Sequence, residues 1–287
     1  MTRVNAKLCA RLPFCVICLT VLLASANLRA QEQKVRVAAA ADLKFAMEEL
    51  SAGFESKTRT KVDITSGSSG NFFSQIQSGA PFDLFFSADM EYVITLDAAG
   101  LAEPGTLYKY ASGRIVIWAP SNMEVDVAKQ GWRALLDPRV QKIAIANPEL
   151  APYGRAAVSA LQKAGIYEQV KNKLVYGENI SQAAQFVQSG NAQAGILAHS
   201  LALSPGMKGG KVWEISAEMH LPIEQGAIVL RNSKNKTVAL AFLKFVKSAQ
   251  GKTILEKHGF TVGRATSNQG AGQTSRRTDS EKGNEQK

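Results

Sequence analysis

The chain has 287 residues, of which 45% are hydrophobic, 20% charged and 7% aromatic. This is the composition of a globular protein with enough apolar residues for two cores, and it excludes fibrous, collagen-like and disulfide-stapled classes. The formal net charge of +10 would by itself suggest nucleic acid or a membrane surface as partner. However, residues 1–30 contribute +4 and residues 263–287 contribute +2, which leaves +4 for residues 31–262. The main part of the chain is only mildly basic, and we predict no nucleic-acid partner.

The first 30 residues have the pattern of a secretory signal peptide. Arg3, Lys7 and Arg11 form a basic head, and residues 12–28 carry no charge. This apolar run is shorter than the ~20 residues that a membrane-spanning helix needs. We therefore expect residues 1–30 to be a leader that is removed on export.

Cleavage is expected after Ala26, where small residues fit the signal-peptidase rule, with Ala30 as the alternative site. The three cysteines of the chain, Cys9, Cys15 and Cys18, all lie in the leader. The mature chain would contain no thiol, which suits an oxidising compartment and excludes cysteine catalysis and thiolate metal sites.

From residue 35 onward, short apolar runs alternate with amphipathic segments. In chain order, the pattern predicts strands at 35–41, 62–66, 83–87, 114–119, 143–146, 173–176, 194–198 and 226–230. The helices expected between and after them are 42–57, 71–78, 91–99, 132–136, 153–164, 180–189, 237–247 and 251–258. Alternation of this kind predicts an α/β fold in which each lobe has a mostly parallel sheet flanked by helices.

The order of these segments predicts two lobes and a tail. We assign residues 31–112 and 222–262 to the first lobe and residues 113–221 to the second. After residue 263 the apolar content collapses into Gly, Ser, Thr, Gln and mixed charges. Such a segment cannot bury enough surface to offset the entropy of ordering it, so residues 263–287 are expected to be disordered.

Four strand-to-helix junctions are the expected ligand site, because open α/β sheets bind ligands at the carboxyl ends of their strands. They are residues 39–43, 66–71, 147–154 and 178–182. The run Ser-Gly-Ser-Ser-Gly in the second junction offers close backbone approach, hydroxyl donors and free amides to an anion at a helix start. It is not a P-loop, since no Gly-Lys-Ser/Thr follows. A plain helix N-cap is the simpler interpretation of the serines alone.

Several segments together resemble the periplasmic molybdate-binding proteins of ABC importers. They are SGSSGNFFSQIQSGAPFDLFFSAD, GRIVIWAP, IAIANPELAPYGRAA and GKTILEKHGFTV, and the resemblance extends from about residue 35 to residue 262. It implies a two-lobed periplasmic-binding-protein fold of type II, with the ligand in the cleft. It also implies a monomer in the periplasm that captures molybdate or tungstate by lobe closure and delivers it to an inner-membrane permease. No cofactor and no enzyme activity are implied, and segments near 110–116 and 222–227 would form the hinge.

The resemblance also assigns donors that hold the oxyanion through its oxygens and not as metal ligands. Ser69 occupies the place of a serine that donates its hydroxyl, and Ile180 that of a residue that donates its backbone amide. Tyr153 matches a tyrosine whose hydroxyl donates in some members. Other members use a tyrosine at the end of the strand 194–198, where this chain has Ala198.

The first junction departs from the family pattern, which has serine or asparagine where this chain has Asp42, and in some members threonine where it has Ala41. An ionised carboxylate beside a buried dianion would be repulsive. One interpretation is that Asp42 caps its own helix, while Ala41 or Asp42 still offers backbone N–H groups. The other is that Asp42 accepts a hydrogen bond from a protonated oxyanion, which would favour phosphate or arsenate, with sulfate a further possible ligand of the same fold.

The remaining candidates are weaker. His199, His220 and His258 have no metal-ligand spacing, and His199 is interpreted mainly as a half-buried strand-end residue. Arg155 either adds a cation near the cleft or is a solvated residue of a first helical turn. The chain contains no Gly-x-Ser-x-Gly elbow and no supported Ser-His-Asp grouping, so we expect a binding protein and not an enzyme.

Overall fold

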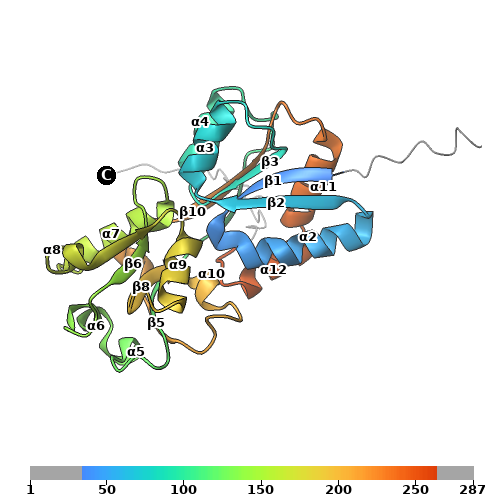
Figure 1. Cartoon of the computed structure of the whole chain (residues 1–287). Coiled ribbons are helices and arrows are strands. Elements are labelled where there is room, and N and C mark those ends of the chain that lie inside the picture. Colours follow the sequence, from blue (N-terminus) through green and yellow to red (C-terminus); the bar gives the residue numbers. More distant parts are fainter. Residues whose placement is uncertain (1–33, 264–287) are drawn as a thin grey trace, which may run out of the picture.

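The computed structural model describes residues 34–263, which form two lobes, each built on a five-stranded sheet (Figure 1). The strand order is β2-β1-β3-β10-β4 in the first lobe and β7-β6-β8-β5-β9 in the second. The predicted signal peptide and all but the first residue of the predicted tail lie outside the described residues. No helix within residues 34–263 is long and apolar enough to cross a bilayer.

The sheet of the first lobe is mostly parallel. Its strands are β1 (Lys34–Ala40), β2 (Lys61–Gly67), β3 (Leu84–Ser87), β4 (Tyr108–Ser112) and β10 (Glu224–Val229). Strand β1 pairs in parallel with both β2 and β3, whereas β10 pairs antiparallel with both β3 and β4. Only β10 therefore runs against the other four strands.

The sheet of the second lobe repeats this arrangement. Its strands are β5 (Ile115–Ala119), β6 (Ile143–Ala146), β7 (Leu174–Gly177), β8 (Ala194–Ala198) and β9 (Lys211–Glu214). Strand β6 is parallel to β7 and β8, and β5 is antiparallel to β8 and β9. The predicted fold class, two lobes with mostly parallel sheets, is confirmed.

Helices flank both sheets (Figure 1). The first lobe has α2 (Lys44–Thr58), α3 (Ser69–Gln77), α4 (Met90–Ala98), α11 (Lys236–Lys247) and α12 (Ala249–Lys257), and a 3₁₀ turn η1 (Ala41–Leu43) precedes α2. The second lobe has α5 (Val127–Gln130), α6 (Trp132–Leu136), α7 (Pro152–Lys163), α8 (Tyr167–Val170), α9 (Ile180–Gln188) and α10 (His199–Ala202), with 3₁₀ turns η2 (Lys171–Lys173) and η3 (Ala217–Met219). The sequence pattern did not predict β9, α5, α8 or α10, it gave no separate strand for β4, and it treated η1 as part of the first helix.

The cores explain why these segments take these forms. In α2 the apolar residues Met47, Leu50 and Phe54 recur at helical spacing and are buried against the sheet. In β3 the neighbours Phe85 and Phe86 point to opposite faces, so that each fills a different core of the first lobe. Each of these fully buried side chains contributes roughly 1.5–3 kcal/mol by leaving water.

The chain crosses between the lobes twice. Residues 113–114 lead from β4 to β5, and residues 215–223 lead from β9 back to β10. The two crossings are hydrogen-bonded to each other, because the Gly113 N–H donates to the Ile223 carbonyl at 2.8 Å. The two crossings therefore lie side by side and form one short connection between the lobes.

Candidate anion site

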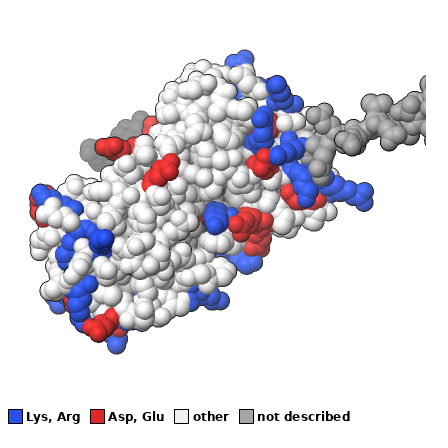
Figure 2. Space-filling view, in the orientation of Figure 1, with Lys and Arg blue, Asp and Glu red and all other residues white. Residues whose placement is uncertain are grey.

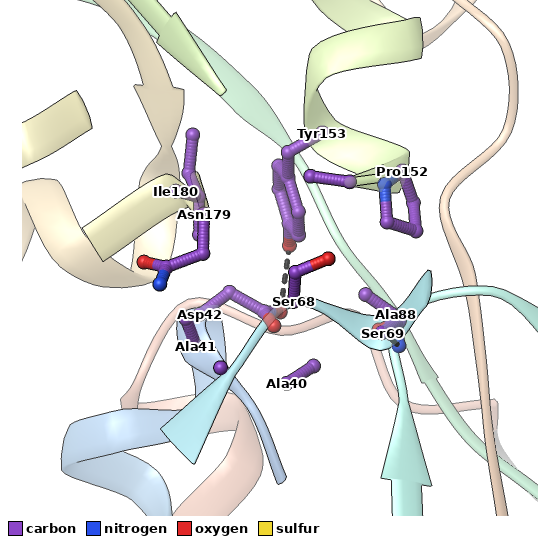
Figure 3. Close-up of a pocket in the computed structure, with 12 residues that line it drawn as sticks. Ala40, Ala41, Asp42, Ser68, Ser69, Ala88, Pro152, Tyr153, Asn179 and Ile180 are labelled. Atoms are coloured by element: carbon purple, nitrogen blue, oxygen red, sulfur yellow. Dashed lines mark hydrogen bonds between the residues drawn. The ribbon is translucent and has the colours of Figure 1, made fainter. Parts of the chain in front are cut away.

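A hollow lies between the lobes, where the four predicted junctions meet (Figure 3). It is lined by Ala40, Ala41, Asp42, Gly67, Ser68, Ser69, Ala88, Ala151, Pro152, Tyr153, Asn179 and Ile180. The starts of α3, α7 and α9 and the turn η1 therefore all face one space. Unpaired N–H groups and helix dipoles give such a place a positive potential without any cationic side chain.

Ser69 presents a hydroxyl proton to this hollow. Its side chain is buried, and its Oγ accepts a hydrogen bond from the Ala88 N–H at 2.9 Å, so the hydroxyl is left free to donate. The neighbouring Ser68 Oγ is already used, because it donates to the Leu150 carbonyl at 2.5 Å. Neither side chain caps α3, so the N-cap interpretation of the serine run is wrong.

The start of α9 presents a backbone donor. Asn179 Oδ1 accepts from the N–H groups of Ser181 and Gln182 at 3.0 and 3.1 Å. The Ile180 N–H, first in the helix, makes no hydrogen bond with any residue from 34 to 263. Asn179 thus pairs with the N–H groups of Ser181 and Gln182 and leaves the Ile180 N–H available to a ligand in the hollow. This is the role that the resemblance assigned to Ile180.

Asp42 is the one ionisable carboxyl group in the lining, and its side chain is buried at the first junction. Its Oδ2 accepts hydrogen bonds from the Tyr153 hydroxyl at 2.9 Å and from Gln225 Nε2 at 2.6 Å. Its Oδ1 is buried and has no hydrogen-bond partner among the described residues. The N-cap interpretation of Asp42 is also wrong, because no side-chain cap bond forms at the start of η1 or of α2.

Burial dominates the titration of this group. Removal from water raises the pKa of Asp42 to about 6, although the hydrogen bonds from Gln225 and Tyr153 and the nearby backbone N–H groups of Asp42 and Leu43 act in the opposite direction. Burial and the nearby Asp42 charge raise the pKa of both Tyr153 and Tyr110 well above the usual range of a phenol. Both tyrosines are therefore neutral hydroxyl groups at any physiological pH.

Tyr153 was expected to donate its hydroxyl to the oxyanion, but in this structure its single proton goes to Asp42 (Figure 3). The hydroxyl oxygen also accepts from Gln225 Nε2 at 3.0 Å. The crossing segment makes room for this arrangement at Gly113, where an added Cβ would lie 2.2 Å from the Tyr153 hydroxyl. Tyr153 thus belongs to the site through Asp42 in this structure.

Gln225 is the site residue that sequence reasoning missed. It lies in β10, is fully buried, and its Oε1 accepts from the Tyr110 hydroxyl at 2.5 Å. A fully buried side-chain amide needs hydrogen-bond partners for both its oxygen and its nitrogen. One signal in the sequence could have indicated Gln225. It is a polar residue that directly precedes the apolar run 226–230, next to a predicted crossing between the lobes.

The two lobes also contact each other directly around the hollow. The Gly70 N–H donates to the Leu150 carbonyl at 3.0 Å, and an added Cβ at Gly70 would lie 2.6 Å from that oxygen. Ser181 Oγ from α9 donates to the Ala41 carbonyl at 2.9 Å. Arg155 does not line the hollow but forms an ion pair with Asp89 of the other lobe. Arg155 therefore forms a contact between the lobes. The sequence had left open whether it is a cation near the cleft or a solvated residue of a first helical turn.

The histidines stand apart from the site. His199 does not line the hollow, and its Nε2 lies 3.7 Å from Glu214, with which it would form an ion pair only when protonated. Burial lowers the pKa of both His199 and His220, so both are neutral at neutral pH. Within residues 34–263 no three His, Cys, Asp or Glu side chains gather in a way that could hold a metal ion.

Comparison with known proteins agrees with this geometry. Residues 35–261 match the family of bacterial extracellular solute-binding proteins. The molybdate-binding protein ModA of Rhodobacter capsulatus is 37% identical over 229 residues, which cover 80% of this chain and 88% of that protein. ModA of Azotobacter vinelandii is 38% identical over 233 residues, covering 80% and 91%. The chain belongs to the family of periplasmic molybdate-binding proteins.

The same family supplies a solved structure. The periplasmic molybdate-binding protein of Azotobacter vinelandii superposes with a TM-score of 0.75 and 31% identity, covering 80% of this chain and all of that one. Members of the family are solute-binding proteins and not enzymes, as the sequence predicted. The alternative ligands, a protonated phosphate or arsenate held by Asp42, or sulfate, are not favoured by these relatives. The sulfate-binding protein SubI of Mycobacterium tuberculosis is only 16% identical and shares the fold alone.

Proposed function

We propose that this protein is the periplasmic solute-binding component of an ABC importer and that it captures molybdate, and with it tungstate, as a tetrahedral dianion. The observation that carries the proposal is the convergence of the free Ser69 hydroxyl and the Ile180 N–H on one buried hollow at three helix starts. Hydrogen-bond donors that are already in position around the hollow stabilise a dianion without a counter-ion. The identity to molybdate-binding proteins supports the choice of ligand.

Capture would proceed by closure of the lobes. The donors come from both lobes, since Ser69 belongs to the first and Ile180 to the second. A ligand that touches both is bound best when they approach, and differential affinity for the closed form is what drives such an equilibrium. The crossings at residues 113–114 and 215–223 would absorb the rotation.

The surroundings of the protein follow from the same proposal. We infer that residues 1–30 are a signal peptide, that the mature chain is monomeric in the periplasm, and that a permease in the inner membrane receives the closed form. Figure 2 shows basic and acidic side chains interspersed on one face, with a broad neutral surface between them. A surface of this kind favours recognition by shape over binding to a polyanion.

The test is calorimetric titration of the mature chain with molybdate, tungstate, sulfate and phosphate. We expect saturable 1:1 binding of molybdate and tungstate, and sulfate and phosphate binding at least ~100-fold more weakly, because the hollow is shaped by fixed donors. Tight binding of phosphate with no response to molybdate would overturn the proposal.

A further inference from the structure

We propose that Asp42 binds the oxyanion in its protonated form, with Oδ1–H donating to a ligand oxygen, so that each anion captured takes up one proton. This inference rests on the function proposed above and adds to it a coupling between ligand and pH. The proton comes from solvent or buffer, a new O–H bond forms at Oδ1, and no other group changes its charge.

The position of the proton follows from the hydrogen bonds. Oδ2 already accepts from the Tyr153 hydroxyl and from Gln225 Nε2, and both donors are held in place by further contacts. Oδ1 is buried, unpartnered among the described residues, and belongs to a residue that lines the hollow. A proton on Oδ2 would have to displace one of its two donors, whereas a proton on Oδ1 displaces nothing. An orphaned buried acceptor is costly, and protonation turns it into a donor where a ligand oxygen would lie.

The ligand makes this protonation favourable. An ionised Oδ1 would face a dianion in a buried site, where like charges repel strongly. Burial has already raised the pKa of Asp42 to about 6, so a small additional push from the ligand completes protonation at neutral pH. The neutral acid then offers a hydroxyl donor at Oδ1 in place of a negative charge.

Within the described part of the chain, the hydrogen-bond partners of this carboxyl group are neutral. Tyr153 on α7 and Tyr110 on β4 are the titratable groups around it, and the pKa of each is raised well above the usual phenol range. Gln225 on β10 does not titrate, and α9 contains no charged residue.

The charged side chains of the neighbouring elements are directed elsewhere. On α10, His199 pairs with Glu214, and on α7, Arg155 pairs with Asp89. On β1, the half-buried Arg36 pairs with Asp83. The other charged residues near this carboxyl group in the chain or on the adjoining elements and junctions are exposed: Lys34, Lys44, Lys61, Asp63, Lys109, Glu149, Glu178 and Glu224. The titration of this site is therefore that of one carboxyl group and the ligand.

The proposal predicts a definite pH dependence. Above the pKa of about 6, each unit of pH lowers the fraction of protein with protonated Asp42 tenfold, so molybdate affinity should fall about tenfold per unit from pH ~7 to pH ~8.5. Asp42→Asn keeps an oxygen for Tyr153 and Gln225 and places an N–H₂ group at the position of Oδ1. That variant should bind molybdate with pH-independent affinity, about tenfold or more tighter than wild type at pH ~8.

The experiment is titration of the mature protein with molybdate in buffers of different ionisation enthalpy, which counts protons directly. We expect uptake of close to one proton per molybdate at pH ~7.5 for wild type and close to none for Asp42→Asn. Asp63→Asn, the same change at an exposed site of the same lobe, should behave as wild type. Asp42→Ser is a second neutral variant, and the infrared carbonyl band of a protonated carboxyl group should appear on binding in wild type alone.

The outcomes separate the two levels of the proposal. Molybdate binding without proton uptake, with an affinity independent of pH, would overturn the role of Asp42 and leave the proposed function standing. Absence of molybdate binding in wild type and in both neutral variants would overturn the proposed function, and this inference with it.

Discussion

The Tyr153 hydroxyl donates to Asp42 Oδ2 at 2.9 Å and joins the two lobes beside the hollow. Tyr153 lies in the first turn of α7 in the second lobe, whereas Asp42 lies in η1, at the first strand-to-helix junction of the first lobe. This hydrogen bond therefore contributes both to the environment of the carboxyl group and to the contact between the lobes. Gln225 Nε2 donates to both groups and so fixes the position of the Tyr153 hydroxyl relative to the Asp42 carboxyl group.

Removal of the free hydroxyl should weaken the ligand complex. Ser69→Ala deletes a buried hydroxyl donor to a charged ligand, which is worth roughly 1.5–3 kcal/mol, so molybdate affinity should fall about 10- to 100-fold. Calorimetry measures this, with Ser74→Ala in the same helix as control, because Ser74 Oγ contacts only the Gly70 carbonyl. An unchanged affinity in Ser69→Ala would remove this residue from the site.

Loss of the Tyr153 hydroxyl should act on both binding and titration. Tyr153→Phe takes a hydrogen bond from Asp42, and since that bond lowers the pKa, the pKa of Asp42 should rise above about 6. We expect a shift of the affinity–pH curve to higher pH, together with weaker molybdate binding at pH ~6, because the hydrogen bond that joins the lobes is lost. A loss of affinity with an unshifted curve would mean that Tyr153 contacts the ligand itself.

Stability without ligand should also depend on Asp42. Its folded-state pKa of about 6 lies above the unfolded value near 3.8, so the folded protein holds the extra proton between these values. The contribution of Asp42 to stability is therefore greatest below pH ~4 and is lost as pH rises through about 6, by an amount on the order of 3 kcal/mol.

The isosteric variant isolates this contribution. Asp42→Asn should be more stable than wild type at pH ~7.5 and should lose that advantage near pH ~4, as followed by thermal or urea unfolding. A variant that is less stable than wild type at both values would contradict the pKa on which the sign depends.

The contact between the lobes should tune affinity without changing the fold. Arg155 pairs with Asp89 across the boundary, and both side chains are partly exposed, so the pair is worth up to ~1 kcal/mol. Arg155→Ala should weaken molybdate binding up to about fivefold and leave thermal stability without ligand nearly unchanged. Arg139→Ala is the control, because Arg139 pairs with Asp137 and Glu124 within one lobe. An equal loss of affinity in both variants would contradict a specific role in closure.

Much of the fold was predictable because hydrophobic periodicity follows burial. The bounds of the strand at 143–146 and of the helix at 132–136 were predicted correctly to the residue. In each segment the buried positions are occupied by apolar residues. Strand β9, with no fully buried residue, and the short helix α10 gave no such signal. The turn η1 was missed because a 3₁₀ start differs from an α-helix only in its first hydrogen bonds.

Parts of the site were beyond sequence reasoning because they depend on contacts between distant residues. Helix starts and polar junctions predicted the places of Ser69, Ile180 and Asp42. What Asp42 does there depends on Gln225, which is 183 positions away in the chain, and on Tyr153, 111 positions away. Local propensity favoured a cap, and tertiary hydrogen bonds and burial prevailed over it.

The most direct test of the account is calorimetric titration of the mature protein with molybdate, with sulfate and phosphate as competitors. We predict saturable 1:1 binding of molybdate that excess sulfate or phosphate barely displaces and that Ser69→Ala weakens. Absence of molybdate binding across pH ~6 to ~8, or binding that Ser69→Ala leaves unchanged and sulfate readily displaces, would contradict the account.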